Sequence, residues 1–379
     1  MVTNYVVILP TLRDHSIQIK VIKIPLHLST FTPYKIIFNN PPEIAMDQTE
    51  EDMKFAGFLG IFNQSFKTIF SWKKIFAQIT LAFILPLTII FIIQITISHH
   101  FFWKIDNNTI PYHASDSREA TATEWLYYAL FTIAYFILLT VFSILATAAV
   151  VFTIASIYTG REVGFRNAIK VIPKVCKRLC ITFIFIYIAQ FIFDVIGTFA
   201  MAIPRIIFGY SVLSVLIIFI ILSLYIYGFL YLSVVCQLAS VVTVLENIHG
   251  FKALKKGKDL ANGKKKVGMR IAFVLYGILV GLNVVYILFV EYGHEVYRLA
   301  LIWRVMIGIL CGILLLMLFL LFIVTQTVLY LVCKSYHREA IDKLSLSTFL
   351  GAYMGETVVY PRSGEEIQLG RDQPPSEQV

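Results

Sequence analysis

Long apolar runs separated by shorter polar segments fill the chain from residue 75 to residue 333. A helix needs about 20 consecutive apolar residues to cross a bilayer. The pattern therefore predicts an all-α integral membrane protein with six transmembrane helices. The predicted spans cover residues 75–97, 125–158, 180–201, 211–245, 271–289 and 305–333. The second and fourth runs are too long for one upright helix, so we expect them to tilt, kink or project beyond the bilayer.

Polar and apolar positions divide the rest of the chain into three further segments. Aromatic and aliphatic residues recur every three to four positions within residues 46–74, which predicts an interfacial amphipathic helix before the first span. Residues 1–45 contain no run long enough to span and differ in composition, so we interpret them as disordered or as an extension of the gene model. Residues 334–379 form a polar tail that is predicted to be cytosolic, and disordered beyond about Tyr360.

Two prolines and a short recurring pattern refine the spans. Pro86 lies within the first span and is expected to kink it, and Pro204 is expected to mark the turn after the third span. The pair Gly164-Phe165 opens a basic segment after the second span, and Gly250-Phe251 does so after the fourth. This recurrence predicts a repeated unit of two spans; chance similarity in a biased sequence is the alternative.

The composition excludes a soluble fold. The 379 residues are 58% hydrophobic and 15% charged, with a mean hydropathy of +0.77, whereas soluble domains carry about 25% charged residues. The net charge of +9 would favour nucleic-acid binding in a soluble protein. Here it reflects the inward bias of Lys and Arg around membrane spans, so we predict no nucleic-acid partner.

The basic residues also give the predicted orientation. They concentrate before the first span, after the second and fourth spans and after the sixth, so these segments and both termini are predicted to be cytosolic. Asn107, in the triplet Asn107-Asn108-Thr109 of the first outer loop, is then a candidate glycosylation site. The outer side receives fewer basic residues, which are Lys104, Arg118, Arg205, Arg298 and Arg304.

A lysine-rich segment at residues 239–270, called the basic hinge below, joins the fourth and fifth spans. Its lysines are candidates for binding anionic lipid headgroups on the cytosolic face, where each Lys or Arg contributes about 1 kcal/mol. The alternative is that these lysines only set the topology. The candidates are Lys252, Lys255, Lys256, Lys264, Lys265 and Lys266.

Asp194 is the one acid well inside a predicted span. Ionisable residues within a membrane are costly and often serve ion or proton pathways. Gln190 lies one turn before Asp194, and Asn283 on another span could join them in an intramembrane polar cluster. The alternative is a structural role, in which Arg205 across the turn neutralises Asp194 or the acid faces the interface.

Two glycine pairs, Gly277 with Gly281 and Gly308 with Gly312, allow helices to approach closely. They predict helix packing, either within the chain or in a homo- or hetero-oligomer.

No arrangement of residues in the sequence points to a reaction. The five cysteines show no metal-binding spacing, and His99, His100 and His113 of the first outer loop match no metal motif. We therefore predict no catalytic residues, no metal site and no cofactor, and we expect the protein not to be an enzyme.

Several short motifs carry a family resemblance. They are Met46-Asp47, residues 55–62 (FAGFLGIF), 79–81 (ITL) with 85–87 (LPL), 155–160 (ASIYTG) and 332–337 (VCKSYH). Through these motifs the chain, from residue 46 to about 360, resembles a plant family of uncharacterised multi-pass membrane proteins. Members of that family typically begin near the position of Met46, and the family offers no known active residues to carry over.

A fainter resemblance lies in the basic hinge, at Ala253, Gly257, Leu260 and Gly263. Their spacing is similar to the Ala-x-x-x-Ser-x-x-Leu-x-x-Gly hinge in the membrane domain of bacterial glycerophosphodiester phosphodiesterases, with Gly257 in place of the usual Ser. In those enzymes a separate soluble barrel performs the catalysis, and this chain shows no such barrel. The resemblance therefore implies a membrane module and no activity.

These patterns predict a non-enzymatic scaffold or lipid-associated module of plant membranes, in the endoplasmic reticulum and endomembrane system or in the plasma membrane. The alternative is a transporter or channel for a small solute or ion that uses Asp194.

Overall fold

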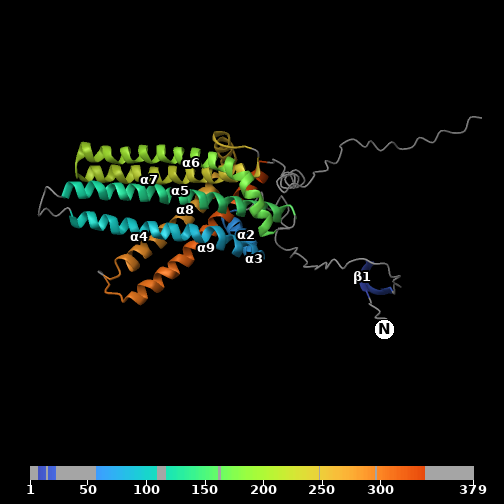
Figure 1. Ribbon diagram of the computed structural model, residues 1–379. Helices are drawn as coiled ribbons and strands as arrows, with labels where there is room; N and C mark the ends of the chain where they lie inside the picture. Colours follow the sequence, from blue (N-terminus) through green and yellow to red (C-terminus); the bar gives the residue numbers. More distant parts are fainter. Residues whose placement is uncertain are drawn as a thin grey trace, which may run out of the picture. The chain divides into compact units, whose positions relative to one another are not determined.

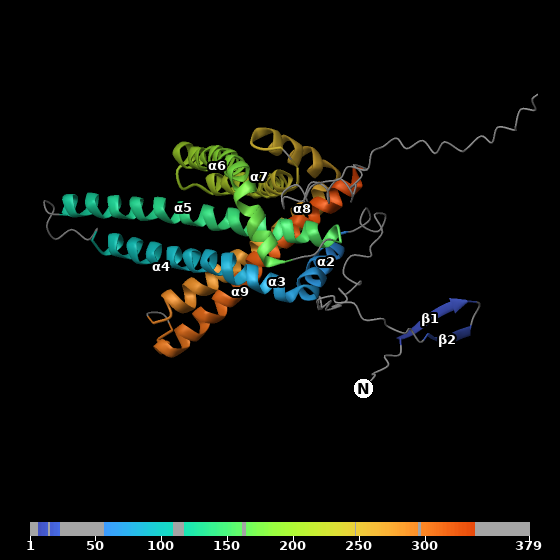
Figure 2. The same cartoon turned by 45° about the vertical axis from the view of Figure 1, so that its right-hand side comes forward.

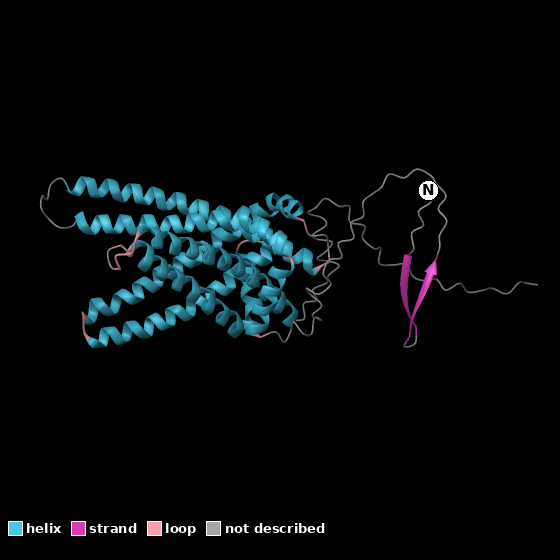
Figure 3. Cartoon of the chain, turned by 90° about the horizontal axis from the view of Figure 1, so that it is seen from below, coloured by secondary structure: helices cyan, strands magenta, loops and turns pink. Residues whose placement is uncertain are grey.

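The computed structural model describes residues 7–13, 16–22, 57–108, 117–160, 164–246, 248–294 and 297–337. The chain divides into two units, Met1–Pro42 and Glu43–Val379, and each is described by itself. In the first unit, strands β1 (Val7–Arg13) and β2 (Ser16–Ile22) form an antiparallel hairpin (Figure 3). The sequence patterns above did not predict this hairpin, although β2 alternates apolar and polar positions as a strand does. The gene-model interpretation of residues 1–45 stays a prediction.

The described part of the second unit is helical and contains six helices long and apolar enough to cross a membrane. The predicted all-α, multi-pass membrane architecture is therefore confirmed for this unit. Its elements are α2 (Phe58–Ser71), α3 (Lys73–Ile79), η1 (Thr80–Ile84), α4 (Leu85–Asn108), α5 (Ser117–Tyr158), α6 (Phe165–Phe208), α7 (Val212–Leu245), α8 (Phe251–Tyr286), η2 (Ile287–Glu291) and α9 (Leu301–Tyr336), where η denotes a π-helix (Figure 1).

The helices extend farther than the apolar runs suggested. The predicted outer loop 98–124 is largely helical, because α4 continues to Asn108 and α5 already begins at Ser117. The turn predicted at Pro204 was wrong, since α6 continues through this proline to Phe208. The chain turns instead at Gly209, whose φ of 58° is a backbone conformation that favours glycine.

One structural unit occurs three times along the chain. Each copy starts with a Gly-Phe pair that opens a helix near one end of the bundle: Gly57-Phe58, Gly164-Phe165 and Gly250-Phe251. A membrane span follows, and a second span returns to the starting end. The first copy ends with α5, the second with α7 and the third with α9. The recurrence seen in the sequence thus coincides with the starts of two of these helix pairs, and a third Gly-Phe pair precedes α2.

The helix that opens a repeat changes direction before it enters the span. In the first copy the break is at Trp72, with φ −113° and ψ 34°. In the third copy it is at Lys264, with nearly the same values, φ −125° and ψ 25°. The second copy carries Pro173 inside its opening helix, closer to the Gly-Phe pair than the breaks in the other two copies. The basic hinge therefore forms a short helix that bends into the fifth span.

The three returning helices α5, α7 and α9 contact one another, and each also packs on the opening helix of a neighbouring copy. These neighbouring pairs are α5 with α6, α7 with α8, and α9 with α2, so the repeats close into a ring. Buried side chains concentrate in the last halves of α5, α7 and α9. We call this densely packed end the basic end, because it also holds the lysine-rich starts of α6 and α8. From it three helix pairs diverge towards the far end (Figure 2).

The contact between α7 and α8 gives the first testable prediction. A Cβ atom at Gly257 would lie 2.8 Å from the carbonyl oxygen of Val235, so Gly257→Ala should force the two helices apart. Such overpacking typically costs about 1–3 kcal/mol, and we expect a lower melting temperature in detergent. Gly277→Ala is the matched control, because a Cβ there meets no atom within 4 Å. A variant Gly257→Ala that melts at or above the wild-type temperature would contradict the packing shown.

Candidate functional site

The glycine and alanine pattern of the basic hinge serves packing. Ala253, Gly257 and Leu260 are all buried at the start of α8. Gly257 rests on the backbone of α7, and a side chain at Gly263 would collide with the ring of Tyr336 on α9. The residues that resemble the phosphodiesterase hinge thus hold α8 against its neighbours.

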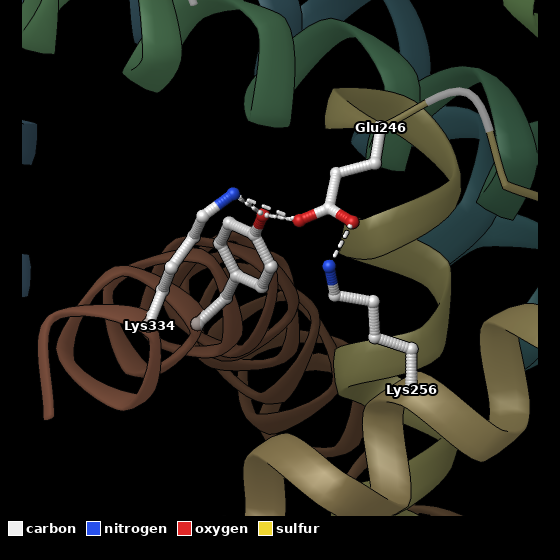
Figure 4. Close-up of polar contacts among 4 residues, drawn as sticks. Glu246, Lys256 and Lys334 are labelled. Carbon is white, nitrogen blue, oxygen red and sulfur yellow. Dashed lines mark hydrogen bonds and ion pairs between the residues drawn. The ribbon is translucent and has the colours of Figure 1, made fainter. Parts of the chain in front are cut away.

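Lys256, one of the predicted headgroup-binding lysines, forms an ion pair within the protein. Its Nζ lies 2.8 Å from Oε2 of Glu246, at the end of α7. The other carboxylate oxygen, Oε1, accepts hydrogen bonds from Lys334 Nζ at 2.9 Å and from the Tyr330 hydroxyl at 2.7 Å, both on α9 (Figure 4). These four residues, called the Glu246 cluster below, tie three helices together at the basic end.

The other five lysines of the predicted set differ in exposure. Lys264 lies over the ring of Tyr336, with its Nζ 5.3 Å from the ring centroid, and Lys265 lies over Tyr231 at 4.3 Å. Lys252, Lys255 and Lys266 are exposed. Headgroup binding stays a prediction, and these last three are the members of the set best placed for it.

Asp194 is partnered within its own pair of helices. Its Oδ1 accepts hydrogen bonds from Gln190 Nε2 at 3.0 Å and from the Tyr225 hydroxyl of α7 at 2.8 Å. Asn283, predicted to join the cluster, instead donates to the carbonyl oxygen of Leu279 on its own helix. Arg205, predicted as a neutralising partner, lies three turns farther along α6 beside the ring of Tyr210. The structure therefore keeps the predicted contact between Gln190 and Asp194 but brings in Tyr225 in place of Asn283.

The far end brings α4 close to η2 through aromatic and polar contacts. His99 Nδ1 lies 3.5 Å from Glu291 Oε2, and the His99 ring packs edge-on against Tyr292. No group of three potential metal ligands gathers within the part of the chain that the structure describes. His113 falls outside that part. Asn107 belongs to the last turn of α4 rather than to a loop, and its glycosylation stays a prediction.

Two π-helical segments interrupt the described helices, η1 before α4 and η2 after α8. In η1, the Leu85 amide donates to the carbonyl oxygen of Thr80, five residues back. Pro86 follows directly and has no amide hydrogen to donate, which favours such a break in the regular pattern. Segments of this kind are rare and frequently occur at functional sites, so their surroundings are candidates for a site.

Both π-helical segments border the same apolar cavity, of about 940 Å³, called the groove below. The end of α2, then α3, η1 and α4 form one wall, and α9 with the end of α8 and η2 forms the other. Along α9 the lining extends from Leu301 to Leu320, which at 1.5 Å per residue is about 28 Å. That length is close to the roughly 30 Å hydrocarbon thickness of a bilayer.

Glycine makes room in the groove. Gly308 and Gly312 line it, and a Cβ at Gly312 would approach only the side chain of Ile92, at 3.4 Å. Neither glycine lies against a neighbouring backbone, unlike Gly257. Within this chain the pair widens the groove instead of bringing two helix backbones together, and its predicted packing in an oligomer stays a prediction. A Cβ atom at Gly277 or Gly281 would meet no neighbouring helix within 4 Å, so the predicted packing of this second pair in an oligomer stays open.

The family model described as a domain of unknown function, DUF8558, matches residues 46–371. The chain belongs to this family. The match covers every described helix of the second unit, and it begins where the composition changes. Neither the comparison with curated proteins nor that with solved structures found a match. The DUF8558 assignment indicates no activity, and the multi-pass membrane character rests on the six long apolar helices. The function therefore has to be argued from the geometry.

The Glu246 cluster predicts how the stability of the DUF8558 domain depends on pH. Burial alone would raise the pKa of Glu246, but hydrogen bonds from Lys256, Lys334 and Tyr330 outweigh burial and lower the pKa below its ordinary value of 4.5. A carboxyl group with a lower pKa in the folded state stabilises the fold fully above its unfolded pKa. This stabilisation is lost as the pH falls through the folded pKa.

We therefore expect thermal stability in detergent to fall as the pH is lowered below about 4.5. Glu246→Gln should remove about 2 kcal/mol at neutral pH, because it leaves two lysines without their carboxylate, and it should flatten the acid decline. Asp259→Asn is the control, since Asp259 is exposed on the same hinge. Equal melting curves for Glu246→Gln and the wild type between pH 4 and 7 would contradict this role.

Proposed function

We propose that this protein is a non-enzymatic, lipid-associated module of the membrane, and that its groove holds the acyl chain of a membrane lipid. The observation that carries the proposal is the groove itself. It is lined almost wholly by carbon, extends along nearly the full thickness of a bilayer, and lies between two π-helical segments. Lipid chains are the apolar molecules that surround such a groove at high concentration.

The lining of the groove suits a lipid chain. Its wall along α9 is about 28 Å long and almost wholly apolar. The pair Gly308 and Gly312 widens the groove locally, which suits a narrow, flexible chain.

The chemistry of the lining favours binding without reaction. Its polar members include Lys73 and Arg304 near opposite ends and Thr80 and Thr88 between them. The Thr88 hydroxyl donates to the carbonyl oxygen of Ile84, at the end of η1. No nucleophile paired with a base stands among the described lining residues. The apolar middle also opposes passage of a polar headgroup, because an unpaired polar group in hydrocarbon costs several kcal/mol.

The exposed lysines of the basic hinge extend the proposal to the membrane surface. Lys252, Lys255 and Lys266 are free to approach anionic headgroups if the basic end faces the cytosol, as the distribution of Lys and Arg predicts. In line with the resemblance to a plant family, we propose plant endomembranes or the plasma membrane as the location of this module.

The groove can be tested by filling it. Gly312→Leu places a side chain in the groove, so we expect native mass spectrometry of the purified protein to show loss of a co-purifying lipid that the wild type retains. Gly277→Leu is the matched control, because this glycine faces open space on α8, and it should retain the lipid. Retention of the same lipid by Gly312→Leu, at the wild-type level, would refute the proposal.

A second candidate function, transport of a small ion, rests on the carboxylate of Asp194 within a span and its two donors. Asp194→Asn keeps an oxygen that can accept from Tyr225 while removing the charge. If Asp194 carries protons, vesicles containing the wild type should acidify at least tenfold faster than vesicles containing Asp194→Asn, at equal folding. The lipid-associated function predicts instead that both proteins leave the flux at the level of empty vesicles.

A further inference from the structure

Arg304 stands where the groove reaches the far end of the bundle, in the first turn of α9. Its Nε donates to the carbonyl oxygen of Val290 in η2, at 2.8 Å. The guanidinium group is therefore held in a fixed position beside the apolar lining. Within the described part of the chain, no carboxylate forms an ion pair with it. Its two terminal nitrogens keep their N–H donors for another partner.

The charge of Arg304 is not explained by membrane orientation. Most of the Lys and Arg residues gather at the basic end, and few basic residues lie at the far end. A positive charge at the far end works against the orientation that the other basic residues set. The hydrogen bond to the carbonyl oxygen of Val290 requires a donor at this position, but an uncharged side chain could supply that donor. A full positive charge calls for an anionic partner.

We propose that the groove takes a glycerophospholipid of the leaflet at the far end, with its phosphate held by the Arg304 guanidinium. This rests on the proposed function and names the ligand class for the same groove. A planar guanidinium can donate two parallel N–H bonds to phosphate oxygens, which a lysine cannot. The apolar lining directly below Arg304 then receives one acyl chain.

The dimensions of the groove agree with this placement. An acyl chain spans half of the hydrocarbon layer, or about 15 Å. Ten residues of α9 rise by about that length, so a chain anchored at Arg304 would extend to the level of Leu314. Gly308 and Gly312 both lie within this stretch and line the groove. The glycines thus open the groove at the depth that the chain would occupy.

The test compares two photoreactive lipids with identical chains, a phosphatidylcholine and a diacylglycerol that lacks the phosphate. The full chain is reconstituted in vesicles containing either probe, and labelling of α9 peptides is quantified by mass spectrometry. We expect the wild type to favour the phosphatidylcholine about tenfold or more, as a hydrogen-bonded charge pair supports. Arg304→Gln keeps a donor for the carbonyl oxygen of Val290 but should abolish the preference, so that the two probes label α9 about equally. Arg298→Gln, at an exposed arginine of the same connection, should leave it unchanged.

The outcomes separate the two proposals. If Gly312→Leu abolishes labelling by both probes but Arg304→Gln keeps the tenfold preference, the lipid groove stands and the phosphate contact is overturned. If Arg304→Gln lowers labelling by both probes by the same factor, the phosphate contact is also overturned. That result would show that Arg304 only shapes the end of η2. If Gly312→Leu leaves labelling by both probes unchanged, the groove itself is not the lipid site.

Discussion

The packing of α5, α7 and α9 against one another at the basic end is the interaction on which the rest of the bundle depends. Helices in a bilayer gain little from burying apolar surface against each other, because lipid chains are equally apolar. Close contact and hydrogen bonds must therefore hold them. The structure uses both: small side chains such as Ala146, Ala149 and Ala239 are fully buried there, and Thr182 of α6 bonds to Thr243 of α7 at 2.9 Å.

Convergence at one end leaves space at the other. Because the Glu246 cluster and the hinge glycines bring α7, α8 and α9 together at the basic end, the helix pairs diverge towards the far end (Figure 2). The groove occupies the space between α4 and α9, where the first and third repeats meet. The position of the groove is thus a consequence of how the ring of repeats closes. Its width depends on lining residues without a side chain, such as Gly312.

The hinge shows how one stretch can combine several roles. The sequence pattern predicted that its lysines form one headgroup-binding set. In the structure, however, Lys256 forms an ion pair with Glu246, Lys264 packs over the ring of Tyr336, and Lys252 is exposed. Its glycine pattern resembles the hinge in the membrane domain of a phosphodiesterase, yet Gly257 serves to bring α8 against the α7 backbone. Proximity in sequence therefore says little about shared function, because successive residues of a helix face different neighbours.

The sequence by itself determined the six spans, because hydropathy and local periodicity act over a few turns of one helix. It also marked Gly308 and Gly312, but assigned them to close helix packing. Only the tertiary structure decided that these glycines line a groove, that Glu246 engages Lys256 and Lys334, and that α9 packs on α2 to close the ring. These outcomes join residues tens to hundreds of positions apart, and no local pattern specifies which faces of long apolar helices will meet.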